Sequence, residues 1–458
     1  MLKPLLLYFG LVHVGFEIAL LLEQAIPILL EQTKQTSRRF FKKRAKRYEG
    51  EDRISALPDD LLVRILSLVP TKDAVPTMIL SKRWRSIWTM VPALQYLEIN
   101  NGTRGIVIAG LLGRLLDRLF GKSDQKPRCI WRFIDGSLQH HKAHVLETLA
   151  ILIGGHCPVN TDVGKWIVNA VDRRVRELSF FLSWSAEPTR LPTCLYTCDT
   201  LVSMGLYDKV LVDVPSPACF PSLKALGLYH VLYKDEDSIV RFLSSCPILK
   251  HLAVHRHYYD NVKRFKIKVP SLEIFWYECT GYKNIEGTLV IDSPALKKLF
   301  ITYNSAGFCL IENKPRFEKA TINVDCYLDN KFMRSISSLK YLELHLNFAT
   351  VACCDAINFS KLMECKLTLA NELDWLDPLM RLLGNSPNLK VVSIDQVCTF
   401  SLMQHAIDLR RISHFHGTNR VLFRDVCQPI SRSLSGEDIE EVEEIKKSLD
   451  TFLPTPSV

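Results

Sequence analysis

Three histidines within five positions, His140, His141 and His144, are the residues whose type and spacing first suggest chemistry. Neutral imidazole nitrogens bind transition metals, and residues three or four positions apart share one face of a helix. No cysteine or carboxylate stands at a spacing that would complete a ligand set beside them. We therefore predict a half-exposed helix here and no metal site.

Catalytic motifs are also missing from the sequence. It contains no glycine-rich phosphate loop, no Gly-x-Ser-x-Gly turn, no His-Glu-x-x-His helix and no paired carboxylates in a recognisable setting. The 14 cysteines form no Cys-x-x-Cys pair and often stand in apolar runs such as residues 246–249, which argues against a disulfide framework or a zinc site. We predict a non-catalytic protein without a cofactor, in the reducing environment of the nucleus or cytoplasm. An enzyme is the weaker alternative, which stoichiometric binding of a metal or cofactor would support.

Composition and charge narrow the possible partners. At 458 residues, of which 47% are hydrophobic, the chain is long enough for two or three globular domains. Eight basic residues lie between Lys34 and Arg47, and without them the net charge of +9 is almost gone. Nucleic acid is therefore not an expected partner. The basic block fits a solvated linker, a nuclear import signal or a contact with anionic lipid.

The first 30 residues are strongly apolar, and the run from Leu5 to Leu22 approaches the length of a membrane span. The basic block that follows would suit the cytoplasmic flank of such a span. Glu17 and Glu23 are costly in lipid, however, and no small-residue cleavage site follows the apolar run. We expect an extension outside the membrane, and a membrane anchor is the alternative.

The elements that organise the chain begin with residues 54–92. Pro58 suits the first turn of a helix, Asp59 and Asp60 suit its N-terminus, and apolar residues follow at helical spacing. A second apolar segment, residues 75–88, carries basic side chains between its aliphatic and indole groups. A unit of about forty residues cannot bury so many large side chains, so a partner should cover the remainder.

Two stretches of this region, Leu-Pro-Asp-Asp-Leu-Leu at 57–62 and Leu-Ser-Lys-Arg-Trp-Arg-Ser-Ile-Trp at 80–88, resemble the F-box of plant F-box proteins. The resemblance implies docking on a Skp-type adaptor and, through it, on a cullin. The residues that would form or support the docked apolar face are Leu57, Pro58, Leu61, Leu62, Ile65, Leu66, Leu80, Trp84 and Trp88. Pro76 departs from the family pattern, and deep inside a helix it would cost about 3 kcal/mol. Family members usually begin close to their F-box, so an appended segment or a misassigned start codon is expected for residues 1–30.

After the F-box, the pattern apolar-x-x-apolar-x-apolar recurs at intervals of 21 to 27 residues. Its starting residues are Val175, Leu201, Leu223, Leu249, Leu272, Leu296, Phe317, Leu339, Leu362 and Leu389. Each unit predicts a short strand with its apolar residues directed inward, followed by a return segment. Units of this length stack into a curved leucine-rich-repeat solenoid with a parallel sheet. The units at Phe317 and Leu362 match the pattern most weakly, and a compact α/β domain with unrelated strands is the alternative.

Strand positions between the inward residues would face solvent on the concave side of the solenoid, the side that such proteins use for binding. The predicted substrate-binding residues on this face are His251, His255, Trp276, Phe300, Tyr341 and His345. Aromatic side chains that the core does not need often anchor interfaces. The simpler alternative is that Trp276 and Phe300 only pack against a neighbouring strand.

The predicted fold is thus α/β: a small helical F-box followed by a leucine-rich-repeat solenoid with a parallel sheet on its concave face. The predicted order is an apolar extension (1–33), a basic linker (34–53), the F-box (54–95), a mostly helical connector (96–174) with helical periodicity over 132–152, the repeats (175–400), and a tail (401–458) with an acidic amphipathic helix. Residues 371–392 resemble the end of plant F-box/leucine-rich-repeat proteins with an FBD module, which is at best partial here.

The resemblance implies the substrate-recognition subunit of an SCF-type cullin–RING ubiquitin ligase, which binds a protein substrate and performs no chemistry itself. The alternative is a leucine-rich-repeat scaffold that binds partner proteins outside a ligase.

Overall fold

The computed structural model describes most of the chain between Ala56 and Gln396, together with one strand beyond. The described ranges are 56–97, 130–154, 162–183, 188–208, 210–256, 261–279, 287–303, 307–313, 315, 317–324, 327–328, 330–347, 350–351, 357–369, 376–396 and 420–424. Two compact units, Met1–Pro58 and Asp59–Val458, make up the chain, and every element below belongs to the second. The predicted apolar extension, basic linker and C-terminal helix lie outside the described residues. Among the described helices, none combines the length and apolarity of a membrane span.

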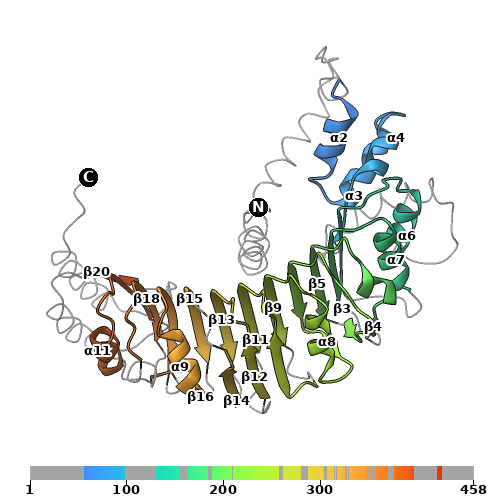
Figure 1. Cartoon of the computed structure of the whole chain (residues 1–458). Helices are drawn as coiled ribbons and strands as arrows, with labels where there is room; N and C mark the ends of the chain where they lie inside the picture. Colours follow the sequence, from blue (N-terminus) through green and yellow to red (C-terminus); the bar gives the residue numbers. More distant parts are fainter. Residues whose placement is uncertain are drawn as a thin grey trace, which may run out of the picture. The chain divides into compact units, whose positions relative to one another are not determined.

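Five short helices form the F-box region (Figure 1). They are α2 (Asp59–Leu66), α3 (Thr71–Ala74), the 3₁₀ helix η1 (Val75–Ile79), α4 (Trp84–Ile87) and the 3₁₀ helix η2 (Trp88–Met90). Pro76 lies in the first turn of η1, directly after α3. Because a 3₁₀ helix does not require the i→i−4 hydrogen bond that proline lacks, the chain changes helix type here without the cost of an interior proline.

A sheet of 13 strands dominates the rest of the unit, and each adjacent pair in it is parallel (Figure 1). In order across the sheet, its strands are β1 (Ala93–Leu97), β2 (Thr148–Gly154), β3 (Glu177–Ser183), β5 (Ser203–Asp208), β7 (Ala225–Tyr229), β9 (His251–Arg256), β11 (Ile274–Cys279), β13 (Lys298–Tyr303), β15 (Lys319–Val324), β17 (Tyr341–Leu346), β18 (Glu364–Leu369), β19 (Val391–Gln396) and β20 (Arg420–Arg424). Each of the ten predicted units contributes one strand, which begins two residues after the start of the pattern. The weak units at Phe317 and Leu362 are as regular as the others, and the predicted fold class is confirmed.

The turn before each strand explains the positions of the prolines. In the unit that leads to β7, the Leu223 N–H donates to the Phe220 carbonyl at 3.3 Å, with Pro221 between them. The same i→i−3 bond precedes β9 (Leu249 to Cys246), β11 (Leu272 to Val269), β13 (Leu296 to Ser293) and β19 (Leu389 to Ser386), and each has proline at the second position. Proline fits this position because its fixed φ suits the turn and its missing N–H is not needed.

Return segments cover one face of the sheet. They include helices α7 (Gly164–Asp172), α8 (Ser238–Ser244), α9 (Asn330–Ile336) and α11 (Leu376–Gly384), the 3₁₀ helix η3 (Thr193–Thr197), and two small sheets. The small sheets consist of β4 (Thr189–Arg190), β6 (Val210–Val212) and β8 (Leu232–Tyr233), and of β10 (Arg264–Lys268), β12 (Gly287–Asp292), β14 (Gly307–Ile311) and β16 (Tyr327–Leu328). Helices α8, α9 and α11 lie on the same side of the large sheet (Figure 1).

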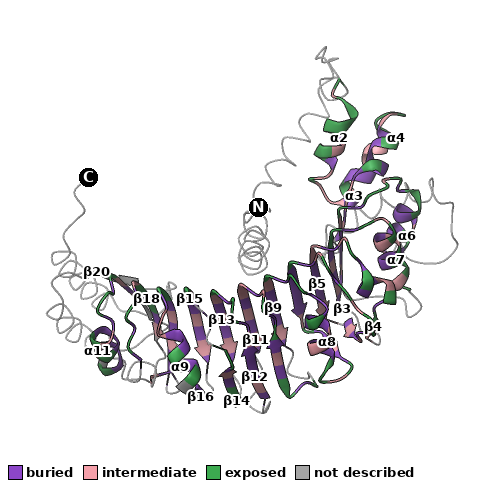
Figure 2. Ribbon diagram, in the orientation of Figure 1, coloured by how far each residue is buried: buried purple, intermediate pink, exposed green. Residues whose placement is uncertain are grey.

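The burial of side chains alternates along the strands, so the sheet has one buried face and one accessible face (Figure 2). In β11 the first, third and fifth residues are half-buried, while Phe275, Tyr277 and Cys279 are buried, and β13 and β15 repeat this pattern. The buried residues face the return segments, because side chains alternate between the two faces of a strand. The first, third and fifth positions therefore form the uncovered face.

The segment between the F-box and the repeats differs from its predicted helical periodicity over residues 132–152. Helix α6 (Ile130–His140) occupies its first part, but Thr148–Gly154 is strand β2, between β1 and β3. The run Leu-Ala-Ile-Leu-Ile is apolar without interruption. Periodicity alone cannot distinguish a buried strand of this kind from a helix, and here the parallel sheet determines the outcome.

Candidate protein-binding surfaces

Helix α2 carries two neighbouring stripes of apolar side chains, one buried and one exposed. Leu62 and Leu66 are buried, whereas Leu61 and Ile65 are 44% and 45% exposed and Leu68, just after the helix, is 83% exposed. The exposed three follow at spacings of four and three residues, so they form one continuous stripe. The end of η1 adds Ile79 and Leu80, each 64% exposed. We call Leu61, Ile65, Leu68, Ile79 and Leu80 the F-box apolar surface.

An ion pair connects the two parts of the F-box that carry this surface. Arg83, just before α4, pairs with Asp59 in the first turn of α2 at 2.6 Å, and its Nε also donates to the same carboxylate. The acidic group at the helix N-terminus is favourable in its own right. Because both side chains are partly exposed, the pair orients the segments more than it stabilises them.

The structure separates the predicted docking residues into two groups. Leu61, Ile65 and Leu80 are exposed, as is Pro58, whereas Leu57 is half-buried. The interior group consists of Leu62, Leu66, Trp84 and Trp88, which are at most 6% exposed. These four support the surface from within and cannot themselves contact a partner without unfolding. Their assignment to adaptor binding stays a prediction.

The F-box is joined to the sheet by backbone and side-chain contacts. β1 begins three residues after η2 and pairs with β2, and the Gln95 N–H donates to Thr71 Oγ1 in α3 at 2.8 Å. His141 is 4% exposed, and its ring nitrogens lie 2.7 Å from the Val91 carbonyl oxygen and 2.7 Å from the Arg173 guanidinium. Arg173, after α7, also donates to the Leu138 and His141 carbonyls. We call this group the His141 junction.

The histidine ring has a defined role in this junction. Its Nε2 must carry the proton because it faces a carbonyl oxygen, and its Nδ1 must accept because guanidinium nitrogens only donate. Burial lowers the pKa of His141 to about 4, the Val91 hydrogen bond raises it, and the charge of Arg173 lowers it. His140 and His144 are exposed. Among the described residues, no group of histidine, cysteine or carboxylate side chains could hold a metal ion.

Aromatic side chains occupy the middle of the uncovered sheet face. Trp276 and Phe300 are in register on β11 and β13, and their rings stack with centroids 4.9 Å apart and an interplanar angle of 18°. The Lys319 Nζ, on β15, lies 6.0 Å from the centroid of the Phe300 ring. Trp276 and Phe300 therefore pack against each other between neighbouring strands. Both rings are only half-buried on the uncovered face, so this packing leaves part of each ring accessible to a partner.

A second aromatic row follows the fifth position of neighbouring strands. Phe181, Tyr207, Tyr229 and His255 stand in register, and the Tyr207 and Tyr229 rings stack at 4.4 Å and 8°. His255 continues the row at 4.7 Å from Tyr229 and pairs with Glu278 at 3.1 Å. We call these four residues the aromatic row.

Glycine makes the orientation of the two tyrosines possible. A Cβ atom at Gly227 would lie 2.5 Å from Tyr229 Cε2, and one at Gly205 would lie 3.0 Å from Tyr207 Cε2. Each tyrosine ring therefore leans back along its strand over the glycine two residues before it. The sequence carries this signal twice, as Gly-Leu-Tyr at 205–207 and at 227–229.

The other predicted substrate-binding residues lie further apart on the same face. His251 is in register with Ile274 on β11, while Tyr341 and His345 are on β17, two strands beyond Phe300. Tyr341 is 39% exposed, and His251 and His345 are half-buried. The structure thus brings Trp276 and Phe300 together, places His255 in the aromatic row, and leaves Tyr341 and His345 as separate positions.

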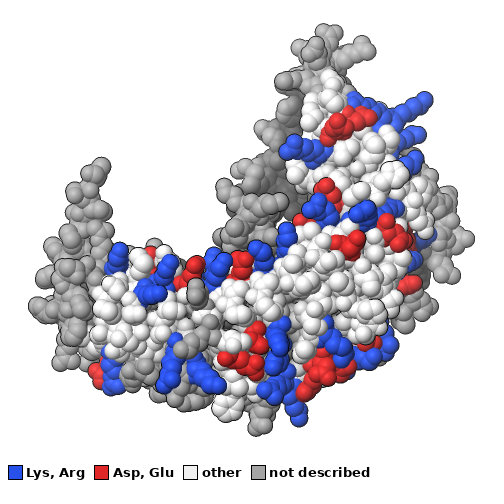
Figure 3. Space-filling model, viewed as in Figure 1, with Lys and Arg blue, Asp and Glu red and all other residues white. Residues whose placement is uncertain are grey.

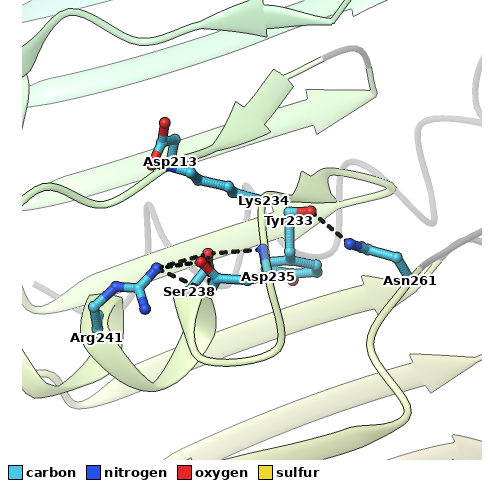
Figure 4. A network of polar contacts seen from close by, with 7 residues as sticks. All are labelled: Asp213, Tyr233, Lys234, Asp235, Ser238, Arg241 and Asn261. Atoms are coloured by element: carbon cyan, nitrogen blue, oxygen red, sulfur yellow. Dashed lines mark hydrogen bonds and ion pairs between the residues drawn. The ribbon is translucent and has the colours of Figure 1, made fainter.

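An open hollow of about 610 Å³ lies beside the three-stranded sheet, and its lining includes the charged residues Asp213, Lys234, Asp235 and Arg241. Lys234 pairs with Asp213 at 3.0 Å, and Arg241 pairs with Asp235 at 2.9 Å (Figure 4). Ser238 donates to Asp235 at 2.8 Å, and hydrogen bonds from Arg241 and then Ser238 lower the pKa of the Asp235 carboxyl. These charges neutralise one another in pairs, so the network fixes the turn before α8.

Comparison with known proteins identifies the family. The F-box domain model matches residues 54–95, and the leucine-rich-repeat model described for FBD-associated F-box protein At5g56370 matches residues 163–316. At1g22000 of Arabidopsis thaliana, which carries an F-box/FBD/LRR-repeat name, is 45% identical over 364 residues, covering 75% of this chain and 72% of the relative. F-box/FBD/LRR-repeat protein At5g56420 of the same plant is 39% identical over 75% of this chain and 77% of the relative. The chain belongs to the plant F-box/FBD/LRR-repeat family.

In this F-box/FBD/LRR-repeat protein, the region assigned to the partial FBD module is described only in part. α11 is followed by β19, and β20 pairs with β19 in parallel, so the sheet continues past the tenth repeat unit. Residues 397–419 and those after 424 lie outside the described part.

Several surface residues of this family member were missed at the level of sequence. Leu68 and Ile79 were not among the predicted docking residues. Helical spacing identifies an apolar stripe, but it does not show which of two stripes is buried. Phe181, Tyr207 and Tyr229 lie on β3, β5 and β7, before the first strand for which binding residues were predicted. The repeated Gly-Leu-Tyr was the available signal.

Proposed function

We propose that this protein is the substrate receptor of an SCF-type cullin–RING ubiquitin ligase, with no catalytic residue of its own. The observation that carries the proposal is the F-box apolar surface, which exposes five large aliphatic side chains on a family-matched F-box. Exposed apolar patches of this kind mark interaction sites. The partner that fits is a Skp-type adaptor, through which the chain would be linked to a cullin.

The His141 junction supports the second requirement of a receptor, a fixed connection between docking site and substrate site. Hydrogen bonds from Lys142 and Ala143 to the Thr89 carbonyl, at 2.8 and 3.0 Å, add to those of His141 and Arg173. A substrate held on the sheet would therefore keep a defined position relative to the adaptor. Such tethering raises the local concentration of substrate at a recruited ubiquitin-conjugating enzyme.

The uncovered sheet face is the proposed substrate site. Large aromatic side chains anchor protein interfaces more often than other residues, and this face carries the Trp276–Phe300 stack and the aromatic row within six adjacent strands, β3 to β13. The predicted residues His251, His255, Trp276, Phe300, Tyr341 and His345 all lie on it. Their role in binding stays a proposal.

Co-purification with the adaptor tests the docking assignment. A Leu61→Asp, Leu80→Asp double variant should lose the adaptor while keeping the thermal stability of the wild type, because both side chains are exposed. Ile248→Asp provides the matched control, since Ile248 is 39% exposed in the repeat region and should leave adaptor binding unchanged. In contrast, Leu62→Ala should lower the free energy of unfolding by about 2–5 kcal/mol, because Leu62 is fully buried.

Equal retention of the adaptor by the wild type and the Leu61→Asp, Leu80→Asp variant would show that the docking surface is misassigned. Binding of a repeat partner with no adaptor association, on the same preparation, would favour the scaffold alternative. The position of Pro76 in the first turn of η1 removes one reason for that alternative, because the proline does not distort the F-box.

A further inference from the structure

We propose that the uncovered face binds an acidic segment of the protein substrate, whose large apolar side chain packs on the Trp276–Phe300 stack while its carboxylates meet Lys298 and Lys319. This inference rests on the proposed receptor function and specifies the substrate chemistry for it. We call Trp276, Phe300, Lys298 and Lys319 the anchor site.

The anchor site is continuous in three dimensions. Lys298 and Phe300 are two residues apart on β13 and so point to the same face, and Lys298 is in register with Lys319 on β15. Lys319 extends diagonally to within 6.0 Å of the Phe300 ring centroid, a distance at which ammonium and ring attract each other. The site therefore presents two adjacent ammonium groups beside two stacked rings.

Its charges are not neutralised locally. Two lysines directly opposite each other on neighbouring strands repel, and among the described residues Lys298 has no ion pair. At the adjoining end of the strands, Glu273 is shared between Lys250 at 3.0 Å and Lys297 at 3.2 Å. Glu318, directly before Lys319, is the second acid at this end of the strands, whereas Glu278, two residues after Trp276 on the same face, lies toward the other end and pairs with His255. Four lysines against two glutamates leave the end of the sheet near the anchor site with an excess of two positive charges.

The neighbouring His251 senses charges of both signs. Burial is the main cause that lowers its pKa, Glu273 raises it, and Lys250 and Lys298 lower it. On the side of the repeat region that Figure 3 shows, basic and acidic groups are mixed. The distinguishing feature of the anchor site is the combination of two adjacent lysines with two half-buried aromatic rings on the uncovered face.

This combination selects an acidic segment with an aromatic or large aliphatic side chain. The rings supply apolar contact area, which a purely acidic chain would not use. Bringing carboxylates to Lys298 and Lys319 relieves the repulsion between the two ammonium groups, which a neutral apolar chain would not do. Complementary charge also speeds the encounter and makes it sensitive to salt.

Fluorescence anisotropy on the purified full chain with its adaptor can test the proposal. The probe is a short labelled peptide in which Glu and Trp residues alternate with Ser and Gly, and the two comparison peptides replace Glu by Gln or Trp by Ser. We expect the acidic aromatic peptide to bind about tenfold more tightly than either comparison peptide, and to weaken between about 50 and about 300 mM salt.

Variants of the chain locate the binding. Lys298→Gln, Lys319→Gln should weaken the acidic aromatic peptide about tenfold and flatten its salt dependence. The matched control is Lys263→Gln, Lys268→Gln, which removes two exposed lysines at β10, outside the large sheet, and should leave binding unchanged. Trp276→Ala should weaken the Glu-Trp peptide more than the peptide that lacks Trp, and thermal melting checks that each variant remains folded.

Three results would overturn the inference: no binding of the acidic aromatic peptide, equal loss in the two lysine double variants, or tighter binding of a single-stranded oligonucleotide of similar charge. Adaptor co-purification with the Lys298→Gln, Lys319→Gln variant separates this question from the receptor proposal. If that variant retains the adaptor but loses the peptide, both stand. If the wild type binds the peptide and never the adaptor, the receptor proposal fails while the anchor site remains.

Discussion

The His141 junction leads to a quantitative prediction about pH. Its imidazole is neutral in the folded protein, donating to the Val91 carbonyl and accepting from Arg173. Protonation would place a second N–H against the guanidinium and a charge in a buried site that Trp88 also borders, with ring centroids 6.5 Å apart. His141→Gln removes the titrating group and keeps a side chain that can both donate and accept.

The magnitude follows from the difference between folded and unfolded pKa values. The pKa of His141 falls from its ordinary value of 6.5 to about 4 on folding. Between these values the unfolded chain binds more protons than the folded one, so stability is fully present above pH 6.5 and is lost as the pH falls. For a shift of this size, about 2 kcal/mol should be lost between pH 7 and pH 5.

Urea unfolding of the full chain at pH 7 and pH 5 measures this loss. The difference in unfolding free energy between the wild type and His141→Gln should shift by about 2 kcal/mol against the wild type at the lower pH, because all other titrating groups cancel in the difference. His144→Gln is the matched control for replacing a histidine by glutamine in this segment, since His144 is exposed three residues away. The reasoning fails if the His141→Gln difference is the same at both pH values.

Two further predictions concern the interior of the repeats. Gly227→Ala should lower the free energy of unfolding by about 1–3 kcal/mol, because the added methyl would collide with the Tyr229 ring. Gly384→Ala, where nothing lies within 4 Å of the new atom, should not lower it, and equal effects in urea unfolding would contradict this account. Burial raises the pKa of the Cys246 thiol to about 12, whereas Cys219 is exposed, so iodoacetamide should modify Cys219 in the folded protein and Cys246 only after unfolding. Mass spectrometry of the labelled peptides provides the measurement.

The repeat architecture could be predicted from the sequence because the apolar pattern of each unit fixes where its strand begins. In five units the first leucine closes a proline turn, and in all ten units the strand starts two residues after the first apolar residue, so a fixed spacing locates the strand. Even the unit at Phe317, whose fourth position is Ala320, keeps this spacing. Its neighbours β13 and β17 supply the hydrogen bonds on both sides, and tertiary context compensates for a small core residue.

The beginning of the sheet carries the same signal but was not predicted. β1 and β2 follow the pattern at Val91-x-x-Leu94-x-Tyr96 and Leu146-x-x-Leu149-x-Ile151, and each strand starts two residues after its pattern begins. Residues 149–153 are apolar without interruption, and periodicity alone cannot distinguish such a buried strand from a helix. Likewise, helical spacing identifies both stripes of α2, but only the packing of Trp84 and Trp88 determines that Leu62 is inside and Leu61 outside.

The F-box and the sheet are continuous in structure, and this continuity bears on function. The F-box does not end where the sheet begins, since its own exit strand is the first strand of the sheet and Thr71 of α3 bonds to it. A small helical unit with five exposed apolar side chains would be only marginally stable alone, because too little of its surface is buried. The F-box shares β1, His141 and Arg173 with the connector, and these contacts stabilise it while its exposed apolar side chains remain accessible. The F-box can therefore keep an apolar surface for a partner while remaining folded in its absence.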